Sequence, residues 1–282
     1  MTRAFKDRCS SPWPMAEPQP AEVVERDAMP LTGAMLVVGF PGPGLVGSVA
    51  TQYLVKHLNL THIASIFSAA FPPSMVVRAG QAVPSFRLYA APMACGLDGT
   101  CNQLVVLIAD APLPDDQLVT MVDGVLSWAK RRGVGEVLLL DGFYVQEDEV
   151  PDSIYGCVND AASLGRLESH EVVPLPSGAV TGPTGAFLVR GTRHSIAVSA
   201  LFGPLPAPQT ADGMPSVWTM PTSARAAARL LTVLDPIIPC ISLDPSPLVK
   251  EAERIESEIK GNLEKQQTSL QRSSEQLSAM YG

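Results

Sequence analysis

Residues 35–47 read MLVVGFPGPGLVG, and this stretch decides the fold class of the chain. Its first four residues form a continuous apolar run, which is typical of a strand covered on both faces of a sheet. The glycines and prolines that follow form a turn, in which Gly42, Gly44 and Gly47 fit the spacing G-x-G-x-x-G. From Leu45 onward the apolar residues recur with helical periodicity. The stretch therefore predicts the strand, turn and helix start of a βαβ unit.

Two interpretations of this turn are open. Its backbone N–H groups could bind the phosphate of a nucleotide, or its glycines could allow a close strand-to-helix junction. The second is favoured, because Pro41 and Pro43 have no N–H to donate, and no acidic residue follows the next strand near Phe67 to bind a ribose. We expect a structural turn and no cofactor. The residues of this structural turn are Gly39, Pro41, Gly42, Gly44 and Gly47.

Composition excludes several classes of protein. The 282 residues carry a net charge of −8, which argues against a general nucleic-acid binder. The chain has no run of eighteen apolar residues and no apolar segment near its start, so neither a membrane span nor a secretory signal is expected. Its five cysteines are scattered, which fits a reduced cytoplasm. Cys95 and Cys101 are the only close pair, and without further ligands nearby they predict no metal site.

Strand and helix patterns alternate from residue 35 to about residue 235. This alternation predicts a three-layer α/β sandwich with a mainly parallel sheet. We expect residues 74–78 to pair with residues 86–91 as an antiparallel hairpin. The strands are expected at 35–38, 62–67, 74–78, 86–91, 104–109, 136–141 and 195–202, and the helices at 45–58, 115–132, 158–167 and 222–234.

Three parts of the chain differ in composition. Residues 1–32 are polar and contain several prolines, and they predict a disordered extension. Residues 33–243 contain the strand and helix patterns and predict the α/β core. Residues 244–282 predict an amphipathic helix and a flexible tail, because leucines and isoleucines recur at spacings of four and seven. The apolar stripe of this helix is narrow, so we expect it to pack on another helix or subunit as a coiled coil.

Candidate catalytic residues are few. Asp110 and Asp141 each follow or end a predicted strand, where α/β enzymes place their active sites, but aspartate is also a common cap or loop residue there. Ser48 follows the glycine turn without a G-x-S-x-G pattern and is expected to be a first-turn hydroxyl. The sequence therefore contains no recognisable catalytic constellation, and we do not expect an enzyme.

The last three residues, Met280-Tyr281-Gly282, form a candidate partner-binding motif. Tyrosine is scarce in this chain, and here it follows a hydrophobic residue directly. The alternatives are a frayed end with an incidental aromatic and a tethered peptide whose tyrosine and free carboxylate dock into a partner's pocket. Several such tails on one oligomer would bind more tightly through their effective concentration.

An ordered set of short motifs resembles the proteasome assembly chaperone type 2 (PAC2) family in its archaeal and bacterial form. The resemblance covers about residues 33–260. The motifs are Gly39-Phe-Pro-Gly-Pro-Gly-Leu-Val-Gly-Ser48, Phe71-Pro-Pro73, Asp110-Ala-Pro-Leu-Pro114, Trp128-Ala-Lys130 before Gly133, Leu140-Asp-Gly142, Thr181-Gly-Pro-Thr-Gly185 and Leu248-Val-Lys-Glu-Ala-Glu-Arg-Ile-Glu256.

The resemblance implies a phosphorylase-like α/β fold without established catalysis, homo-oligomers and a role with the 20S proteasome. Met280-Tyr281-Gly282 matches the hydrophobic–tyrosine–any residue (HbYX) tail that binds between proteasome α-subunits, where the terminal carboxylate pairs with a lysine. The hypothesis is thus an archaeal-type assembly chaperone homologue or ATP-independent activator that binds the 20S α-ring. The alternative is a nucleotide-binding or hydrolytic α/β enzyme that uses the turn at residues 42–47.

Overall fold

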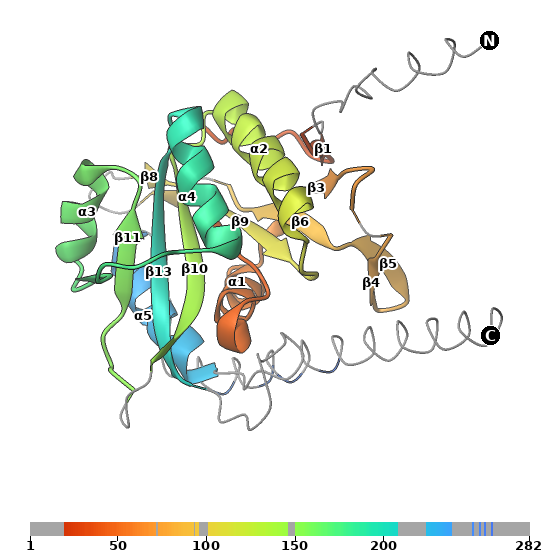
Figure 1. The fold of residues 1–282 in the computed structure, drawn as a ribbon. Helices are drawn as coiled ribbons and strands as arrows, with labels where there is room; N and C mark the ends of the chain where they lie inside the picture. Colours follow the sequence, from red (N-terminus) through yellow and green to blue (C-terminus); the bar gives the residue numbers. More distant parts are fainter. Residues whose placement is uncertain are drawn as a thin grey trace, which may run out of the picture.

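A nine-stranded sheet forms the centre of the molecule (Figure 1). The computed structural model describes residues 20–71, 73–92, 94–95, 101–145, 150–207 and 224–238, with residues 250, 254, 257 and 261. The strands, in spatial order, are β1 (Glu22–Glu25), β3 (Thr61–Phe67), β6 (Phe86–Ala90), β9 (Leu104–Ala109), β2 (Met35–Gly39), β10 (Glu136–Val145), β13 (Ala197–Pro206), β11 (Tyr155–Val158) and β12 (Val173–Pro174).

The sheet is mixed, and its parallel part lies at the centre. Strands β9, β2, β10 and β13 are parallel neighbours. On one side β6, β3 and β1 continue the sheet with antiparallel pairing, and on the other β11 is antiparallel to β13 and parallel to β12. The predicted α/β fold is confirmed, with the correction that antiparallel strands flank a parallel centre.

Helices cover both faces of the sheet. Helices α1 (Val46–His57) and α5 (Ala224–Ile237) pack on one face, and α2 (Asp115–Arg132) and α4 (Gly182–His194) pack on the other. Along β10, Leu138 and Leu140 belong to the core beneath α1 and α5, whereas Val137 and Leu139 belong to the core beneath α2 and α4. This alternation gives the three layers of the sandwich. None of the helices in the described part of the chain is long and apolar enough to cross a membrane.

The remaining elements are short. They are the 3-10 turn η1 (Pro43–Leu45), helix α3 (Ala161–Glu168) and two hairpins, β4 (Met75–Arg78) with β5 (Gln81–Pro84) and β7 (Ala94–Cys95) with β8 (Cys101–Asn102).

The predicted pairing of residues 74–78 with residues 86–91 is wrong. Strand β4 pairs with β5, which follows immediately, because Ala79 and Gly80 both have positive φ angles, 48° and 78°. Two such residues form the tight turn that joins adjacent antiparallel strands. Strand β6 instead lies between β3 and β9, where Phe86 and Leu88 are buried in the core.

The predicted helix at residues 158–167 begins later, at Ala161. Asp160 caps it by accepting a hydrogen bond from the backbone N–H of Ser163 at 3.0 Å. The preceding residues form β11, because its backbone pairs with β13. Strands β10 and β13 also extend beyond the predicted ends, since they pair with each other over their whole length.

The disorder predicted for residues 1–32 is wrong for its last part, where β1 pairs with β3. The backbone N–H of Ala21 donates to Thr120 O on α2 at 3.0 Å, and Trp128 Nε1 donates to Glu25 Oε1 at 2.7 Å. Gly124 permits this contact, since a Cβ there would lie 2.2 Å from Ala21 O. These long-range contacts order a segment whose composition is that of a loop. Residues 1–19 lie outside the described residues.

The predicted C-terminal helix lies almost entirely outside the described residues. Of residues 244–282, the structure describes Lys250, Arg254, Ser257 and Gly261, all of which are helical. The flexible tail and its Met280-Tyr281-Gly282 motif are outside the described part and stay predictions.

The glycine turn brings the start of α1 against the backbone of two central strands. A Cβ on Gly47 would lie 2.1 Å from Leu140 O of β10, and a Cβ on Gly39 would lie 2.2 Å from Gly47 O. A Cβ on Gly142 would likewise lie 2.5 Å from Pro43 O. Contacts this short leave no room for a side chain. The geometry is that of a close strand-to-helix junction.

Replacing Gly47 with alanine should therefore destabilise the fold by about 3 kcal/mol or more, because the methyl group must displace the backbone of β10. Gly165→Ala is the matched control, since a Cβ at Gly165 on α3 meets nothing within 4 Å. That change should stabilise the protein by about 0.5–1 kcal/mol. Urea unfolding followed by circular dichroism measures both. Equal stabilities of the two variants would contradict the junction described here.

Candidate functional site

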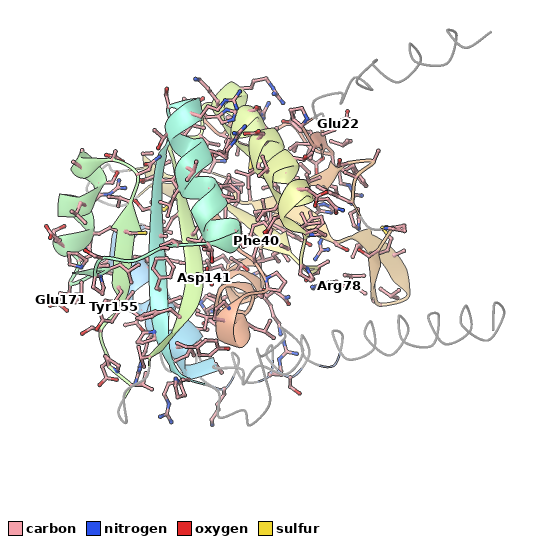
Figure 2. The ribbon with its side chains drawn as sticks, in the orientation of Figure 1. Glu22, Phe40, Arg78, Asp141, Tyr155 and Glu171 are labelled. Carbon is pink, nitrogen blue, oxygen red and sulfur yellow. The ribbon has the colours of Figure 1, made fainter. Side chains whose placement is uncertain are left out.

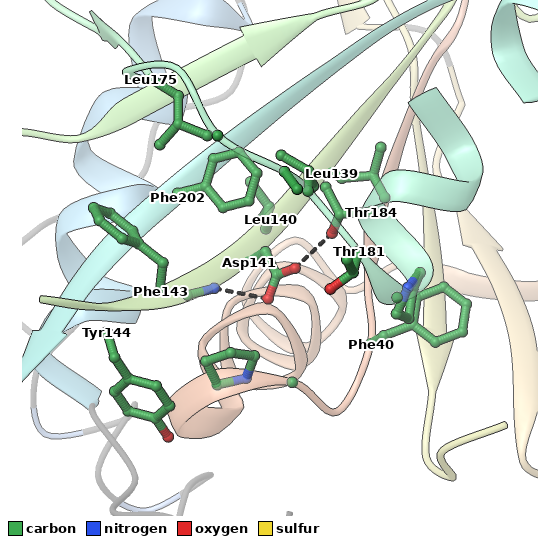
Figure 3. Close-up of a pocket in the computed structure, with 18 of the residues that line it drawn as sticks. Phe40, Leu139, Leu140, Asp141, Phe143, Tyr144, Leu175, Thr181, Thr184 and Phe202 are labelled. Atoms are coloured by element: carbon green, nitrogen blue, oxygen red, sulfur yellow. Dashed lines mark hydrogen bonds between the residues drawn. The ribbon is translucent and has the colours of Figure 1, made fainter. Parts of the chain in front are cut away.

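A pocket of about 480 Å³ opens beside the carboxyl-terminal halves of β2 and β10 (Figure 3). Its walls come from the glycine turn, from residues 139–144 of β10, from the segment 175–184 that leads into α4, and from Phe202 of β13. Asp141 and Phe40 lie near the centre of the molecule, below α4, whereas Arg78 lies toward the β4–β5 hairpin (Figure 2). The carboxyl ends of parallel strands are where α/β proteins usually bind ligands.

The lining of the pocket is mostly apolar. Within the described part of the chain, Asp141 is the only charged side chain that lines it, and Tyr144 is the only other titratable one. Thr181 and Thr184 add two hydroxyl groups. The apolar side chains of the wall are Val38, Phe40, Pro43, Leu139, Leu140, Phe143, Leu175, Pro176, Ala179, Val180, Pro183 and Phe202.

Strand alternation places the Asp141 carboxyl group in this pocket. Asp141 is two residues beyond Leu139 and shares its face of β10, on the side of α4. Thr184 Oγ1, in the first turn of α4, donates to Asp141 Oδ2 at 2.5 Å, and the backbone N–H of Gly142 donates to Oδ1 at 2.8 Å (Figure 3). Gly42 leaves space for the carboxyl group, since a Cβ there would lie 2.8 Å from Oδ1.

The electrostatic state of Asp141 is set by its surroundings. Burial raises the pKa of Asp141 to about 6, and the hydrogen bonds from Thr184 and Gly142 offset part of this increase. The carboxyl group is therefore mostly ionised at neutral pH. No lysine, arginine or histidine is found among the described residues that line the pocket. Asp141 is thus an anion in a largely apolar cavity, without a cationic partner among the lining residues.

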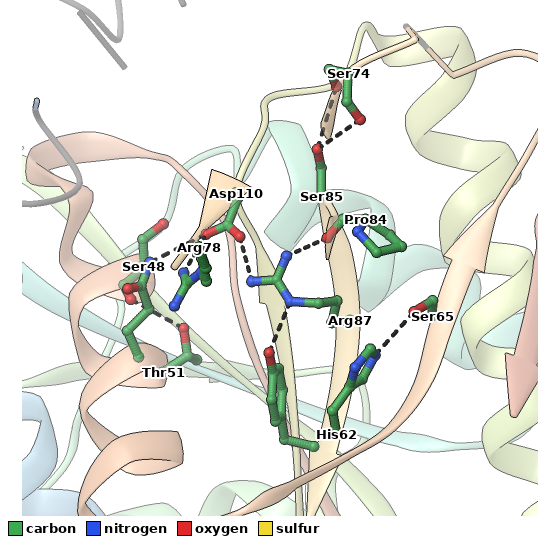
Figure 4. Close-up of polar contacts among 12 residues, drawn as sticks. Ser48, Thr51, His62, Ser65, Ser74, Arg78, Pro84, Ser85, Arg87 and Asp110 are labelled. Carbon is green, nitrogen blue, oxygen red and sulfur yellow. Dashed lines mark hydrogen bonds and ion pairs between the residues drawn. The ribbon is translucent and has the colours of Figure 1, made fainter. Parts of the chain in front are cut away.

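Asp110, the other strand-end aspartate, belongs to a buried ion pair (Figure 4). Arg87 of β6 has a side chain that is 0% exposed, and its Nη2 lies 2.5 Å from Asp110 Oδ2. Arg87 also donates to Tyr89 Oη at 2.9 Å and to the carbonyl oxygen of Pro84. Burial acts to lower the pKa of Arg87, but Asp110 and Tyr89 outweigh it and raise this pKa.

Asp110 Oδ1 contacts two further elements. It accepts a hydrogen bond from Gln52 Nε2 of α1 at 3.3 Å and lies 3.5 Å from Arg78 Nη2 of β4. The cluster therefore connects β6, the end of β9, α1 and the β4–β5 hairpin.

The two aspartates do not form a catalytic pair. Asp110 contacts Gln52 on α1, whereas Asp141 contacts Thr184 on α4, and these helices cover opposite faces of the sheet. Strand β2 lies between the strands that carry them. Ser48 is 2% exposed, does not line the pocket, and its Oγ has no hydrogen-bond partner among the described residues.

The other sequence-predicted residues have separate locations. Gly42 and Pro43 line the pocket, while Gly39 and Gly47 lie in the junction beside it. Cys95 and Cys101 are opposite each other in the register of the β7–β8 hairpin. Within the described ranges, no three His, Cys, Asp or Glu side chains lie close enough to hold a metal ion.

The contact between Asp141 and Thr184 is the part of the site that sequence reasoning missed. Both residues lie in motifs that the sequence shows, Leu140-Asp-Gly142 and Thr181-Gly-Pro-Thr-Gly185. One signal in the sequence could have helped. Side chains alternate between the two faces of a strand, so Asp141 lies on the same face of β10 as Leu139. The partner helix on that face is not visible in the sequence.

Comparisons with known proteins give a consistent result. The profile of the PAC2 family matches residues 36–262. The fold is similar to the crystal structure of Pyrococcus furiosus PbaA, an archaeal homologue of proteasome-assembly chaperone, with a TM-score of 0.68 and 25% identity over 89% of this chain and 99% of that one. It is also similar to P. furiosus PbaB, an archaeal proteasome activator, with a TM-score of 0.68 and 19% identity over 86% and 98%. An uncharacterised protein of Methanocaldococcus jannaschii is 22% identical over 84% of this chain and 88% of its own length.

The raised pKa of Asp141 predicts a specific pH dependence of stability. The folded chain holds the Asp141 proton more tightly than the unfolded chain, where the pKa is near 3.8. The contribution of Asp141 to stability is therefore greatest below about pH 4, declines up to about pH 6 and is constant above that. Asp141→Asn removes this titration, so the variant does not share the loss of stability that the wild type shows as the pH rises. The Tm of the variant minus the Tm of the wild type should therefore increase between pH 4 and pH 7.

Thermal unfolding across this pH range is the measurement, with the exposed Asp116→Asn on α2 as the control. The difference in Tm between Asp116→Asn and the wild type should stay constant across this pH range. A constant Tm difference between Asp141→Asn and the wild type would show that Asp141 titrates normally.

Breaking the buried Arg87–Asp110 pair should be costly. Arg87→Leu leaves the carboxylate of Asp110 without its main partner and should lower the free energy of unfolding by about 3–5 kcal/mol. Arg166→Leu is the control, because Arg166 pairs with Glu136 while its own side chain is 43% exposed. That variant should lose no more than about 1 kcal/mol. Denaturant unfolding measures both variants. Similar losses of unfolding free energy would show that the burial of Arg87 does not make its ion pair more important for stability.

Proposed function

The chain belongs to the PAC2 family, and we propose that it is a proteasome assembly chaperone homologue or ATP-independent activator that binds the 20S α-ring through its C-terminal tail. The observation that carries this proposal is the likeness to PbaA, which extends over almost the whole of both chains. The likeness to PbaB is one of fold, and it adds a second protein whose crystal structure is described as that of a proteasome activator.

The tail supports the choice of the α-ring as the partner. Met280-Tyr281-Gly282 has the order hydrophobic, tyrosine, any residue, and the preceding 20 residues contain no proline. An aromatic anchor combined with a terminal carboxylate is a recognised way for a short peptide to bind a preformed pocket. A single three-residue contact binds weakly, so we also propose a homo-oligomer in the cytoplasm, whose several tails act together.

The pocket favours this reading over a nucleotide-binding or hydrolytic enzyme. Gly42 and Pro43 contribute to its wall, but the only charged group that the described residues place in the lining is the Asp141 carboxylate, which repels a phosphate. Pro41 and Pro43 have no N–H, so they remove two donors that a phosphate site would use. We propose that the protein acts by binding and not by catalysis.

Deleting Met280 to Gly282 should weaken binding to 20S α-rings about tenfold or more, because the loss of one anchoring aromatic at an interface commonly has this effect. Adding one glycine after Gly282 should also weaken binding, because it moves the carboxylate away from its position. Ser278→Ala, just before the motif, is the matched control and should bind normally. Surface plasmon resonance on immobilised 20S particles measures all four proteins.

Two outcomes would contradict the proposal. Undiminished binding of the truncated protein, at an unchanged native mass, would exclude docking through the tail. A rise in Tm with a nucleotide at millimolar concentration would favour the alternative, because a ligand that binds the folded state stabilises it.

A further inference from the structure

The pocket around Asp141 has no role in the proposed function, although its chemistry is specific. We propose that it binds a small molecule that carries a protonated amine on an apolar body, with the ammonium group against the Asp141 carboxylate. This proposal does not depend on whether the C-terminal tail binds the proteasome.

The first argument is charge. A carboxylate in an apolar cavity is unfavourable unless a positive charge or several donors compensate it. Gly142 supplies one hydrogen bond to Oδ1, and Thr184 supplies one to Oδ2. Each carboxylate oxygen can accept two hydrogen bonds, so acceptor capacity is left for a ligand. Among the described residues the lining supplies no lysine, arginine or histidine, so a ligand can bring the positive charge that this carboxylate lacks.

The second argument is the shape and polarity of the cavity. A volume of about 480 Å³ lies within the range of small-molecule sites, which are mostly apolar with a few polar groups that set the orientation. Phe40, directly after β2, Phe202 of β13 and Leu175 before α4 line the pocket together with Asp141 (Figure 3). Val180 of the same segment as Leu175 also belongs to the lining. This arrangement suits an apolar body whose charged end lies at Asp141.

The same features exclude other ligand classes. Phosphates and carboxylates would be repelled by the Asp141 anion. A divalent cation such as Ca²⁺ takes six to eight oxygen ligands, whereas Asp141 is the only carboxylate among the described residues of the lining. An uncharged apolar molecule would leave the carboxylate without a partner. An ammonium group, which donates up to three hydrogen bonds, matches the free acceptor positions.

A purely structural role for Asp141 makes a different prediction. Asp141 also holds the first turn of α4 through Thr184, and an uncharged asparagine at this position could accept the same hydrogen bond. If that contact were its whole function, the charge of Asp141 would not affect ligand binding. The two readings are separated by comparing ligands of the same shape and different charge.

The test uses three probes with one aromatic body: phenethylamine, the neutral 2-phenylethanol and the anionic phenylacetate. Ligand-detected NMR titrations on the full chain at pH 7.5 measure their affinities. Phenethylamine should bind at least ten times more tightly than 2-phenylethanol, and phenylacetate should bind most weakly. The longer 4-phenylbutylamine should bind more tightly than phenethylamine, because it fills more of the apolar wall.

Variants then locate the site. Asp141→Asn should bring the affinities for phenethylamine and 2-phenylethanol together. Gly178→Leu should weaken both, because Gly178 lines the pocket and a Cβ there has only Pro176 O nearby, at 3.8 Å. The added side chain therefore has room to enter the pocket, and the Tm should stay close to that of the wild type. Asp116→Asn, on the exposed start of α2, should change the affinity for neither probe.

The preference for the amine should also decrease below about pH 6, as Asp141 becomes protonated. The described surroundings of Asp141 contribute no competing titration. The glycine turn, the segment before α4, α4 itself and β13 place no titratable side chain among the described residues of the lining, and burial raises the pKa of Tyr144 on β10, which stays neutral.

Equal affinity for phenethylamine and 2-phenylethanol would overturn the proposal, as would a preference for the amine that persists in Asp141→Asn. The absence of binding by either amine at millimolar concentration would overturn it as well. None of these results would bear on the interaction of the tail with the proteasome, because the tail variants and the pocket variants are tested by separate measurements.

Discussion

The close approach of α1 to the central strands is the constraint on which the rest of this structure depends. Gly47 lies against the carbonyl of Leu140, and Gly39 lies against Gly47, at distances that exclude any side chain. The chain can therefore pass from β2 into α1 within a few residues. The same turn brings Gly42 and Pro43 to the edge of the cavity that holds Asp141. A motif that resembles a phosphate-binding loop thus acts as one wall of a pocket whose charge is negative.

Two aspartates, Asp110 directly after β9 and Asp141 within β10, show how the sheet separates chemical roles. Asp110 faces α1 and pairs with the buried guanidinium of Arg87, so its charge is used within the fold. Asp141 faces α4, receives only neutral donors, and has a raised pKa. Asp110 has its countercharge inside the fold, whereas the described residues that line the pocket supply none to Asp141.

Membership of the PAC2 family joins this core to a proposed role with the proteasome, and the two proposals concern different parts of the chain. The tail would recognise a large partner through three residues at one end of the sequence. The pocket would recognise a small molecule inside the folded core. Asp141 and α4 are connected through Thr184, so occupancy of the pocket would act on a helix that covers one face of the sheet.

The sequence by itself determined the α/β class, the central strands and helices α1, α2 and α5, because their signals are local: apolar runs, helical periodicity, and the basic end and glycine cap of α2. Only the tertiary structure decided which segments contact β4, β1 and Asp141. The positive φ angles of Ala79 and Gly80 made β4 pair with β5, contacts with α2 ordered β1, and the packing of α4 brought Thr184 to Asp141. Each of these depends on which segments, distant or adjacent, meet in space, and a pattern along one chain carries no such information.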